Sequence, residues 1–387
     1  MKVVFRKSDL SHGLAIAGHA TSNRSLPILA NVKLSAEQNR VLLEATNLEL
    51  GVQCWVEAVV EEAGCVTLPA KLLTDFVNIL PHEQITIAVS EGTSQSTITS
   101  ELSEATMPTI DPTEFPIWPT LGTGGFSLSL EAQIFKELVG DVAFAASTDE
   151  KRPALTGICL QVGSDKITCA AADAFRLAVR SFLLADGTAE PTELVVPAKT
   201  LKEIAAILPA QGQVTIRATA NQILFYTDTV NLASRLLEAR YPNFWQMIPE
   251  EYHTRAVMET RLFQPVIKAA ALFAQDSTHT ATLDLKPQVG KLTISAQAEG
   301  IGANTSTIPA AYSHPIEDLT MLFNVRYIAD VLAVIGDAVE IAFEVCTGTK
   351  PAILRPVGTR EAIFLIMPML IKPKQPARPA TEEAAPL

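Results

Sequence analysis

The chain repeats one helical segment at a spacing of about 127 residues. TLPAKLLTDFVNILP (67–81) and VVPAKTLKEIAAILP (195–209) share a Pro-Ala-Lys start and an Ile-Leu-Pro end, and both ends are offset by 128 residues. A weaker third copy, FNVRYIADVLAVI (323–335), aligns with the first at an offset of 255. A repeat of this length is a whole domain, since solenoid units span only about 20 to 50 residues. The spacing therefore predicts three domains of one fold.

Two other pairs of segments repeat at nearly the same spacing. LPILANVKL (26–34) parallels RPALTGICL (152–160) at 126 residues, and EAQIFKELVGDVAFAA (131–146) parallels ETRLFQPVIKAAALFA (259–274) at 128. Turn-rich segments that suit linkers fall between the repeats. The expected domains are therefore residues 1–120, 121–247 and 248–371, followed by a Pro- and Ala-rich tail, 372–387, that is expected to be disordered.

Each domain is expected to combine two helices with antiparallel strands. One helix comes early in each repeat, and the Pro-Ala-Lys helix comes late. Runs of alternating apolar and polar residues, such as QVTIRA (213–218) and KLTISAQ (291–297), indicate strands around them. The sequence therefore predicts an α+β fold.

The late helix is amphipathic in its first copy. Its polar residues follow the i, i+3, i+4, i+7 spacing of one helix face. They are Lys71, Thr74, Asp75 and Asn78. The remaining apolar residues of the helix are expected to be buried: Leu72, Leu73, Phe76, Val77, Ile79 and Leu80.

All three copies place a cation at the start of this face and an acid four residues later. The cations are Lys71, Lys199 and Arg326, and the acids are Asp75, Glu203 and Asp330. A cation at a helix start opposes the helix dipole and costs roughly a few tenths of a kcal/mol. One interpretation is an exposed helix face with an ion pair between the two residues. The other is a set of equivalent cations that face one anionic partner.

The net charge of −12 limits how the chain can meet nucleic acid. Duplex DNA is a dense line of negative charge, so bulk attraction does not draw an acidic protein to it. A role on DNA therefore requires basic residues concentrated on one face, or retention by something other than affinity.

The chain carries no sequence signature of a cofactor, a metal or a membrane span. The five cysteines and six histidines are scattered, with no C-x-x-C pair and no H-E-x-x-H motif, so no metal site and no cofactor are expected. No run of about 18 apolar residues occurs, and the N-terminus lacks the apolar core of a signal peptide. A cytoplasmic protein without membrane contact is expected.

Six stretches stand out for the combination that they form. They are NRSLPILANVKL (23–34), RPALTGI (152–158), AADAFRLAV (171–179), RYPNFWQMIP (240–249), FNVRYIADVL (323–332) and FLIMPM (364–369). In this order and spacing, over residues 1–371, the sequence resembles the bacterial DNA polymerase III beta subunit family, the sliding clamps.

The resemblance implies three domains of one fold, each with two helices and antiparallel sheets, in a head-to-tail homodimeric ring. The helices line a hole that encircles duplex DNA in the nucleoid. Such a subunit is not an enzyme, and it tethers the replicative polymerase to confer processivity. A ring is held by topology and needs no tight binding, which reconciles a role on DNA with the net charge of −12.

The resemblance also implies a set of DNA-facing cations: Arg24, Lys71 and Lys199. From the helix face and the repeat positions we add three more: Lys202, Lys268 and Arg326. Contacts from these residues are expected to go to phosphates, so no base sequence is read.

A second site implied by the resemblance is a hydrophobic cleft between the second and third domains. It takes short linear motifs from the DNA polymerase III alpha subunit, the clamp loader, other polymerases and repair proteins. The matching positions are Arg152, Leu155, Ala172, Ala174, Phe175, Arg176, Leu177, Pro242, Gln246, Met247, Leu365, Ile366, Met367, Pro368 and Met369. Methionine is flexible and polarizable, which suits a cleft with many partners. Taken singly, Leu155, Leu177 and Met367 also fit ordinary core packing.

This chain departs from the family pattern at three cleft positions. The turn that usually reads Thr-Asp-Gly-His-Arg-Leu has Ala174 for the glycine and Phe175 for the histidine. Gln246 stands where some members have a basic residue. Glycine tolerates a positive φ that alanine does not. We therefore expect a cleft that is more apolar, less cationic and altered in its peptide preference.

The family's ring pairs the first domain of one chain with the third domain of the other. Leu272 and Phe273, at the end of the early helix of the third domain, match its hydrophobic interface positions. Both residues also fit a core position.

Two other classes of function fit parts of the sequence. An enzyme is disfavoured because LGTGGF (121–126) lacks the Lys-Ser/Thr end of a phosphate loop, and GIGANT (300–305) does not lie between a strand and a helix. A repeat scaffold that binds proteins but not DNA would suit the acidic charge. Geometry separates it from a clamp, in which the cationic helix starts converge on one hole.

Overall fold

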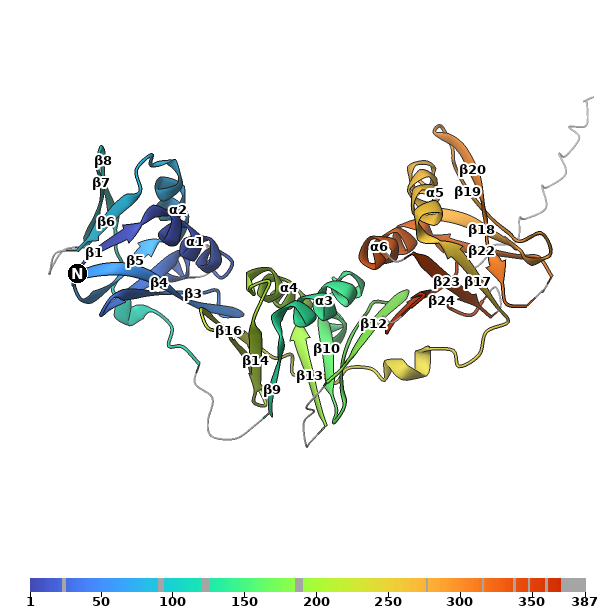
Figure 1. Cartoon of the computed structure of the whole chain (residues 1–387), viewed down its shortest axis with the longest axis horizontal. Coiled ribbons are helices and arrows are strands. Elements are labelled where there is room, and N and C mark those ends of the chain that lie inside the picture. Colours follow the sequence, from blue (N-terminus) through green and yellow to red (C-terminus); the bar gives the residue numbers. More distant parts are fainter. Residues whose placement is uncertain are drawn as a thin grey trace, which may run out of the picture. The chain divides into compact units, whose positions relative to one another are not determined.

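Figure 1 shows the computed structural model of the chain, which describes residues 1–22, 26–89, 94–119, 126–184, 191–275, 278–314, 317–336, 339–346, 349–358 and 361–369. The chain divides into two compact units. The first is Met1–Ala174 with Ala178–Asn243, and the second is Phe175–Leu177 with Phe244–Leu387. The expected tail, 372–387, lies outside the described residues.

One order of elements occurs three times, with two helices among eight strands. The first copy is β1 Lys2–Arg6, α1 Lys7–Gly18, β2 Asn31–Glu37, β3 Arg40–Thr46, β4 Leu50–Glu62, β5 Gly64–Pro69, α2 Ala70–Ile79, β6 Gln84–Ala88, β7 Gln95–Ser100 and β8 Ser103–Pro108. The second is β9 Phe126–Glu131, α3 Ala132–Val142, β10 Gly157–Val162, β11 Lys166–Ala172, β12 Arg176–Leu183, β13 Thr192–Pro197, α4 Ala198–Ile207, β14 Gln213–Ala218, β15 Gln222–Tyr226 and β16 Val230–Arg235.

The third copy follows the same order with one short extra strand, β21. It is β17 Thr254–Glu259, α5 Thr260–Phe273, β18 Thr280–Lys286, β19 Lys291–Ala298, β20 Gly302–Pro309, β21 Ala311–Tyr312, β22 Leu319–Asn324, α6 Val325–Ile335, β23 Glu340–Val345, β24 Ala352–Pro356 and β25 Ala362–Ile366. The threefold order confirms the predicted α+β fold with two helices in each domain.

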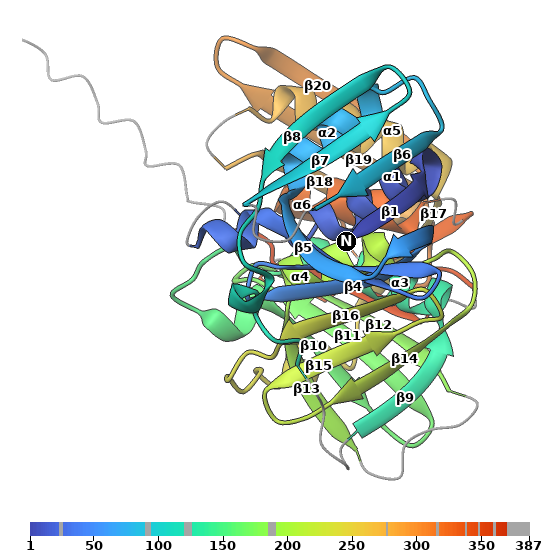
Figure 2. The same cartoon turned by 90° about the vertical axis from the view of Figure 1, so that its left-hand side faces the viewer.

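The first two domains share one antiparallel sheet, whose main path is β8-β7-β6-β1-β4-β16-β15-β14-β9. The long strand β4 pairs with both domains. Its residues 58–62 lie opposite β1, and its residues 50–54 lie opposite β16. Figure 2 shows β4 beside β16. The backbone hydrogen bonds of one strand therefore join the two domains.

Polar side chains cross the same joint from β2 to β16. Lys33 Nζ lies 3.0 Å from a carboxylate oxygen of Glu44, which is buried. Gln53 donates to the other oxygen of Glu44 at 2.8 Å and accepts from Asn231 of β16 at 3.3 Å. The charge of the buried Glu44 is therefore paired.

Strands β2, β3 and β5 pair beside β4 in the same sheet, and the remaining strands of each unit form further antiparallel rows. The first unit contains β13-β10-β11-β12, and the second contains β20-β19-β18-β22 and β25-β24-β23-β17-β21. In each domain the early and late helices pack against each other. Aromatic rings fill the cores, with Phe135 and Phe225 at 5.2 Å between centroids in the second domain and Phe323 and Phe343 at 5.8 Å in the third.

The α2 helix departs from its predicted burial. Leu73 and Val77 are buried as expected and Phe76 is half-buried, but Leu72 is 51% and Ile79 is 77% exposed. The helix packs on α1, β2 and β5. Leu72 and Ile79, seven residues apart, share a stripe that these elements leave bare. The prediction that both would be buried is wrong, because apolar spacing does not say how many faces of a helix are covered.

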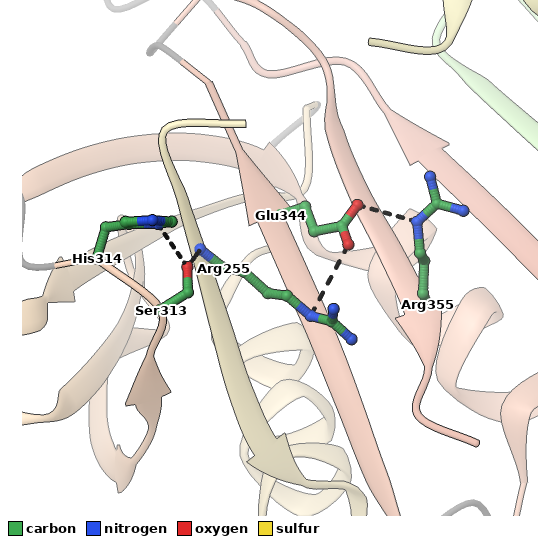
Figure 3. A network of polar contacts seen from close by, with 5 residues as sticks. All are labelled: Arg255, Ser313, His314, Glu344 and Arg355. Atoms are coloured by element: carbon green, nitrogen blue, oxygen red, sulfur yellow. Dashed lines mark hydrogen bonds and ion pairs between the residues drawn. The ribbon is translucent and has the colours of Figure 1, made fainter. Parts of the chain in front are cut away.

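A network of charged side chains links three strands of the second unit (Figure 3). Glu344 on β23 is buried between Arg355 on β24 and Arg255 on β17. Arg355 Nε donates to one carboxylate oxygen at 2.9 Å, and Arg255 Nε lies 3.8 Å from the other. The Arg255 backbone N–H donates to Ser313 Oγ at 3.1 Å, which lies 3.0 Å from His314 Nδ1. One carboxylate therefore holds two guanidinium groups over the sheet.

We predict that Glu344→Gln lowers the free energy of unfolding by about 1–3 kcal/mol, because it leaves two guanidinium groups without a counter-charge. The value is at the lower end for a buried ion pair, since both arginines are about a third exposed and partly screened by water. Urea unfolding followed by circular dichroism measures the change. The matched control is Glu340→Gln on the same strand, an exposed residue, with an expected change below about 0.5 kcal/mol. Equal losses in the two variants would contradict this role.

Candidate nucleic-acid and peptide-binding sites

An exposed cation occupies the second position of the late helix in each domain. The three are Lys71 of α2, Lys199 of α4 and Arg326 of α6. The residue before α2 and the residue before α4 are prolines, which offer no side-chain cap. In α6 the Asn324 side chain accepts from the Arg326 backbone N–H at 3.0 Å. The structure therefore places the three side chains at equivalent points of the repeat.

The acid four residues later does not pair with the cation of its own helix. A carboxylate oxygen of Glu203 lies 2.6 Å from His19 Nδ1 at the end of α1, and one of Asp330 lies 2.5 Å from Arg176 Nη1. Over the described ranges, none of the three cations takes part in an ion pair. An ion pair within the helix is therefore not the reason for a cation at these helix starts.

The other predicted DNA-facing cations do not recur at equivalent positions of the repeat. Lys202 is exposed on α4, one turn after Lys199, and Lys268 is exposed on α5. Neither forms an ion pair within the part of the chain that the structure describes. Arg24 lies outside the described residues.

Two more helix lysines have a structural role. Lys7 at the start of α1 donates to the Leu80 carbonyl oxygen after α2 at 2.5 Å, and Lys136 of α3 donates to the Leu208 carbonyl oxygen after α4 at 3.0 Å. A cation is favourable at the C-terminal end of a helix, where the dipole is negative and carbonyl groups lack helix partners. These lysines hold helix pairs together and do not belong to the exposed set.

Five residues assigned to the peptide cleft belong to the first unit: Arg152, Leu155, Ala172, Ala174 and Pro242. Arg152 is exposed and precedes a 3-10 helix, Pro153–Thr156. The Leu155 backbone N–H donates to the Arg152 carbonyl oxygen at 3.0 Å, and the Leu155 side chain is half-buried. Leu155 is therefore neither a pure core residue nor a fully exposed one.

Ala172 is buried at the end of β11, and Tyr241 lies beside it. Tyr241 is buried, and this burial raises the pKa of its phenol. Ala174 and Pro242 are both exposed. The Tyr241 contact thus fixes the chain next to Pro242 close to the end of β11.

The other ten cleft residues belong to the second unit: Phe175, Arg176, Leu177, Gln246, Met247, Leu365, Ile366, Met367, Pro368 and Met369. The Met367 N–H donates to the Phe175 carbonyl oxygen at 2.8 Å, and the Met369 N–H donates to the Leu322 carbonyl oxygen at 2.7 Å. These bonds bring the last strand, the 175–177 segment and β22 together.

Of the ten residues, Arg176, Pro368 and Met369 are half-buried, and burial separates the other seven into two groups. Leu177, Leu365 and Ile366 are buried, which is the core packing that their apolar character also allowed. The exposed members are Phe175, Gln246, Met247 and Met367. Only this second group offers its side chains to a ligand in the absence of rearrangement.

Tyr327 of α6 joins this cluster and was not predicted from the sequence. The rings of Phe175 and Tyr327 stack, with centroids 6.5 Å apart and planes at 22°, and the Arg176 guanidinium lies 4.6 Å from the Tyr327 centroid. Arg176 also pairs with Asp330, so its charge is used within the unit. Tyr327 and Asp330 share a helix face by their spacing, but no sequence signal brings that face to residues 175–177.

The two predicted dimer residues differ in exposure. Leu272, near the end of α5, is 65% exposed, so it is not a core residue. Phe273 is half-buried and lies beside β20, where a Cβ at Gly302 would be 3.7 Å from its ring. The end of α5 therefore presents an apolar surface next to β20.

Residues suited to metal or thiol chemistry are not gathered in the described parts of the chain. There, no group of three or more His, Cys, Asp or Glu side chains could hold a metal ion. Burial raises the pKa of the Cys54 and Cys159 thiols to about 12, as expected for thiols that pack in a core. No helix within the described ranges is long and apolar enough to cross a membrane.

Three family models of the DNA polymerase III beta subunit match consecutive parts of the chain. The N-terminal domain model matches residues 1–119, the central domain model 129–243 and the C-terminal domain model 245–370. The beta sliding clamp of Synechococcus elongatus is 30% identical over 379 residues, which cover 96% of this chain and 100% of that protein. The chain belongs to the DNA polymerase III beta subunit family.

Other clamps are similar in sequence and in structure. The beta sliding clamp of Staphylococcus aureus is 30% identical over 358 residues, 89% of this chain and 92% of that protein. The sliding clamp of Bacillus subtilis superposes with a TM-score of 0.90 at 27% identity, and that of Pseudomonas aeruginosa bound to griselimycin with 0.89 at 24%. Each covers 96% of this chain and 100% of the other chain.

This membership confirms the prediction of a sliding clamp. The chain is a processivity subunit of DNA replication and not an enzyme. The similarities to known sliding clamps favour that function over an acidic scaffold that binds only proteins.

Proposed function

We propose that two copies of this chain close head to tail into a ring around duplex DNA. The observation that carries the proposal is the joint between the first two domains. There β4, the fourth strand of one domain, pairs with β16, the last strand of the next domain. The same joint, repeated between two copies, would close the ring.

The repeat identifies the strands that a second copy would join. The fourth strand of the third domain is β20, and the last strand of the first domain is β8. Within the described residues β20 pairs with β19 alone, and β8 pairs with β7 alone. An edge strand presents unpaired N–H and C=O groups that accept another strand. Pairing of β20 in one copy with β8 in the other would therefore reproduce the β4–β16 joint.

A helix contact accompanies the joint inside the first unit. Residues 128 positions after Leu72 and Ile79 are Thr200 and Ile207 of α4, and both are buried. Beside them, Glu203 of α4 pairs with the residue that follows α1. At this joint the end of an early helix therefore lies against the late helix of the following domain.

A ring would provide the missing cover for α2. The early helix of the third domain is α5, and its end carries the exposed side chain of Leu272. In the second copy, the corresponding late helix is α2, with Leu72 and Ile79 exposed. Burial of these three side chains favours association, because it removes apolar surface from water.

The exposed cations of the late helices would then contact DNA phosphates. Lys71, Lys199 and Arg326 recur at one point of the repeat, and the proposed DNA-facing set also includes Lys202, Lys268 and Arg24. Topology retains a closed ring, so weak contacts to phosphate suffice and allow sliding. The acidic remainder of the chain suppresses binding to DNA from outside. The clamp would work in the cytoplasm, on the DNA of the nucleoid.

Partner proteins would bind through short linear segments at the predicted cleft residues. The exposed Phe175, Met247 and Met367 supply apolar surface, and Asp330 neutralises Arg176. Peptides with apolar anchors suit such a site. The expected partners are the DNA polymerase III alpha subunit, the clamp loader, other polymerases and repair proteins.

We predict that Leu272→Glu converts the dimer to monomer, because each of the two interfaces would bury an unpaired carboxylate. Sedimentation velocity of the full chain measures the dimer fraction. Val59→Glu is the matched control, since Val59 on β4 is 64% exposed and should leave the dimer intact. A dimer fraction equal to that of the unaltered chain would rule out the proposed interface.

We predict that the clamp stays on closed circular DNA after loading and is lost when one cut makes the circle linear. Gel filtration of the DNA-bound fraction measures retention. Replacement of Lys71, Lys199 and Arg326 by Gln should leave retention on circles intact, since topology holds the ring. The same variant should load with a weaker dependence on salt, because fewer phosphate contacts release counterions. Equal loss of the unaltered chain from circles and linear DNA would refute the ring.

We predict that griselimycin, which is bound in a Pseudomonas aeruginosa clamp structure, also binds this chain at the exposed cleft residues. Met367→Glu should weaken binding at least about tenfold, or about 1.4 kcal/mol, because it places a charge in an apolar site. Titration calorimetry measures the affinity. Val357→Glu, matched in exposure, is the control. Unchanged affinity of the Met367→Glu variant, or no binding by the unaltered chain, would argue against this assignment.

A further inference from the structure

A groove lies at the joint of the first two domains, away from the residues assigned above. Its volume is about 280 Å³, and it is formed by the turn between β3 and β4, the segment 115–119 and the end of β16. This volume is near the lower end for ligand sites, which suits two or three side chains of a peptide better than a larger molecule.

The groove exposes apolar side chains on a fixed floor. Ile117 is 95% exposed and Leu48 is 45% exposed, both at its lining. The Trp118 indole forms the floor and lies against Gly51, where a Cβ would be only 3.1 Å from the ring. A side chain at position 51 would require the indole to shift by a few tenths of an ångström, so glycine allows the ring to lie close to β4.

Leu48 is held in an unfavourable backbone conformation. Its φ is 73°, in the left-handed region, which a bulky residue rarely adopts. Asn47 Oδ1 accepts from the backbone N–H groups of Glu49 at 3.0 Å and Leu50 at 2.8 Å, and Thr46 Oγ1 accepts from the Leu48 N–H at 3.1 Å. Such strain persists where surrounding bonds impose it, and it is concentrated at binding sites.

The segments of this groove are repeat counterparts of the proposed peptide cleft. The turn 47–49 follows the third strand of its domain, as the turn 173–175 does in the second domain. The sequence EFP (114–116) parallels RYP (240–242) at 126 residues. Both turns expose a large apolar side chain, Leu48 in one and Phe175 in the other. The same parts of the fold that serve the cleft therefore form an apolar groove one repeat earlier.

The charge at the groove differs from that of the cleft. The cleft turn is followed by Arg176, whereas the groove turn ends in Glu49, which is exposed and forms no ion pair over the described ranges. Glu44, also in the lining, is already paired with Lys33. Arg235 lies next to Glu49, since its backbone N–H donates to the Glu49 carbonyl oxygen at 3.3 Å, and its exposed side chain offers donors for peptide carbonyl groups.

We propose that this groove binds a short linear peptide of a partner protein, with an apolar anchor against Leu48, Ile117 and Trp118 and a basic side chain at Glu49. The proposal depends on the clamp function in one respect, since a clamp is expected to have partner proteins that carry linear segments. A partner that carries two such segments would engage the groove and the cleft together, and gain avidity without new contacts.

The full chain labelled with 5-fluorotryptophan tests the proposal by 19F NMR. The chain has three tryptophans, Trp55, Trp118 and Trp245, and Trp118→Phe assigns the signal of the groove. The probes are the acetylated and amidated peptides Gly-Leu-Phe-Lys-Lys-Gly and Gly-Leu-Phe-Glu-Glu-Gly. We expect the lysine peptide to shift the Trp118 signal, to leave the Trp55 signal unchanged and to bind at least about tenfold more tightly than the glutamate peptide.

Charge reversal provides the decisive comparison. Glu49→Lys should exchange the preference of the two peptides, whereas Glu57→Lys, an exposed glutamate of β4 outside this groove, should not. A Trp118 signal that neither peptide shifts, equal affinity for both peptides, or an unchanged preference in Glu49→Lys would overturn the proposal.

The tail of the chain itself has a similar apolar and basic composition at LIKPK (370–374). A chain that ends at Met369 separates this occupant from a partner. If truncation alone shifts the Trp118 signal, the groove belongs to the tail and the partner proposal is wrong. Retention on circular DNA does not involve the groove, so failure here and failure of the clamp function are distinguishable.

Discussion

The pairing of β4 with β16 is the interaction on which the architecture depends. β4 is long enough to complete the sheet of its own domain and to begin that of the next. Its polar neighbours, from Lys33 through Glu44 and Gln53 to Asn231, satisfy the buried charge at the crossing. Because backbone hydrogen bonds make the joint, two domains of one fold can be joined without a matched set of side chains.

The exposure of side chains distinguishes a helix that lies at such a joint from a helix that does not. At the joint inside the first unit, Thr200 and Ile207 of α4 are buried, whereas their counterparts Leu72 and Ile79 on α2 are exposed. The exposed stripe belongs to the first domain, and within the described residues β8 of the first domain and β20 of the third each pair on one side. A protein with an apolar stripe and an open strand at each end is prone to associate, and the proposed closed dimer would pair these two strands.

Electrostatics explain how an acidic chain can work on DNA. The acids that follow the cations of α4 and α6 pair with His19 and Arg176, which leaves Lys199 and Arg326 available to phosphates. In the proposed ring, a few exposed cations would give contacts that are weak singly and independent of base sequence. The groove at the first joint and the predicted cleft use related parts of the repeat, but the groove has Glu49 free of an ion pair over the described ranges whereas Arg176 of the cleft is paired with Asp330, so they would select different peptides.

The sequence by itself determined the threefold repeat, the two helices of each domain and the cations at the helix starts. These follow from spacing and residue type, which local structure obeys. Tertiary structure decided which faces are covered. It left Leu72, Ile79 and Leu272 exposed, buried Leu177 and Leu365, and paired Asp330 with Arg176 instead of Arg326. The physical reason is that periodicity shows which side chains share a face, whereas burial and pairing depend on residues distant in the chain that pack against that face.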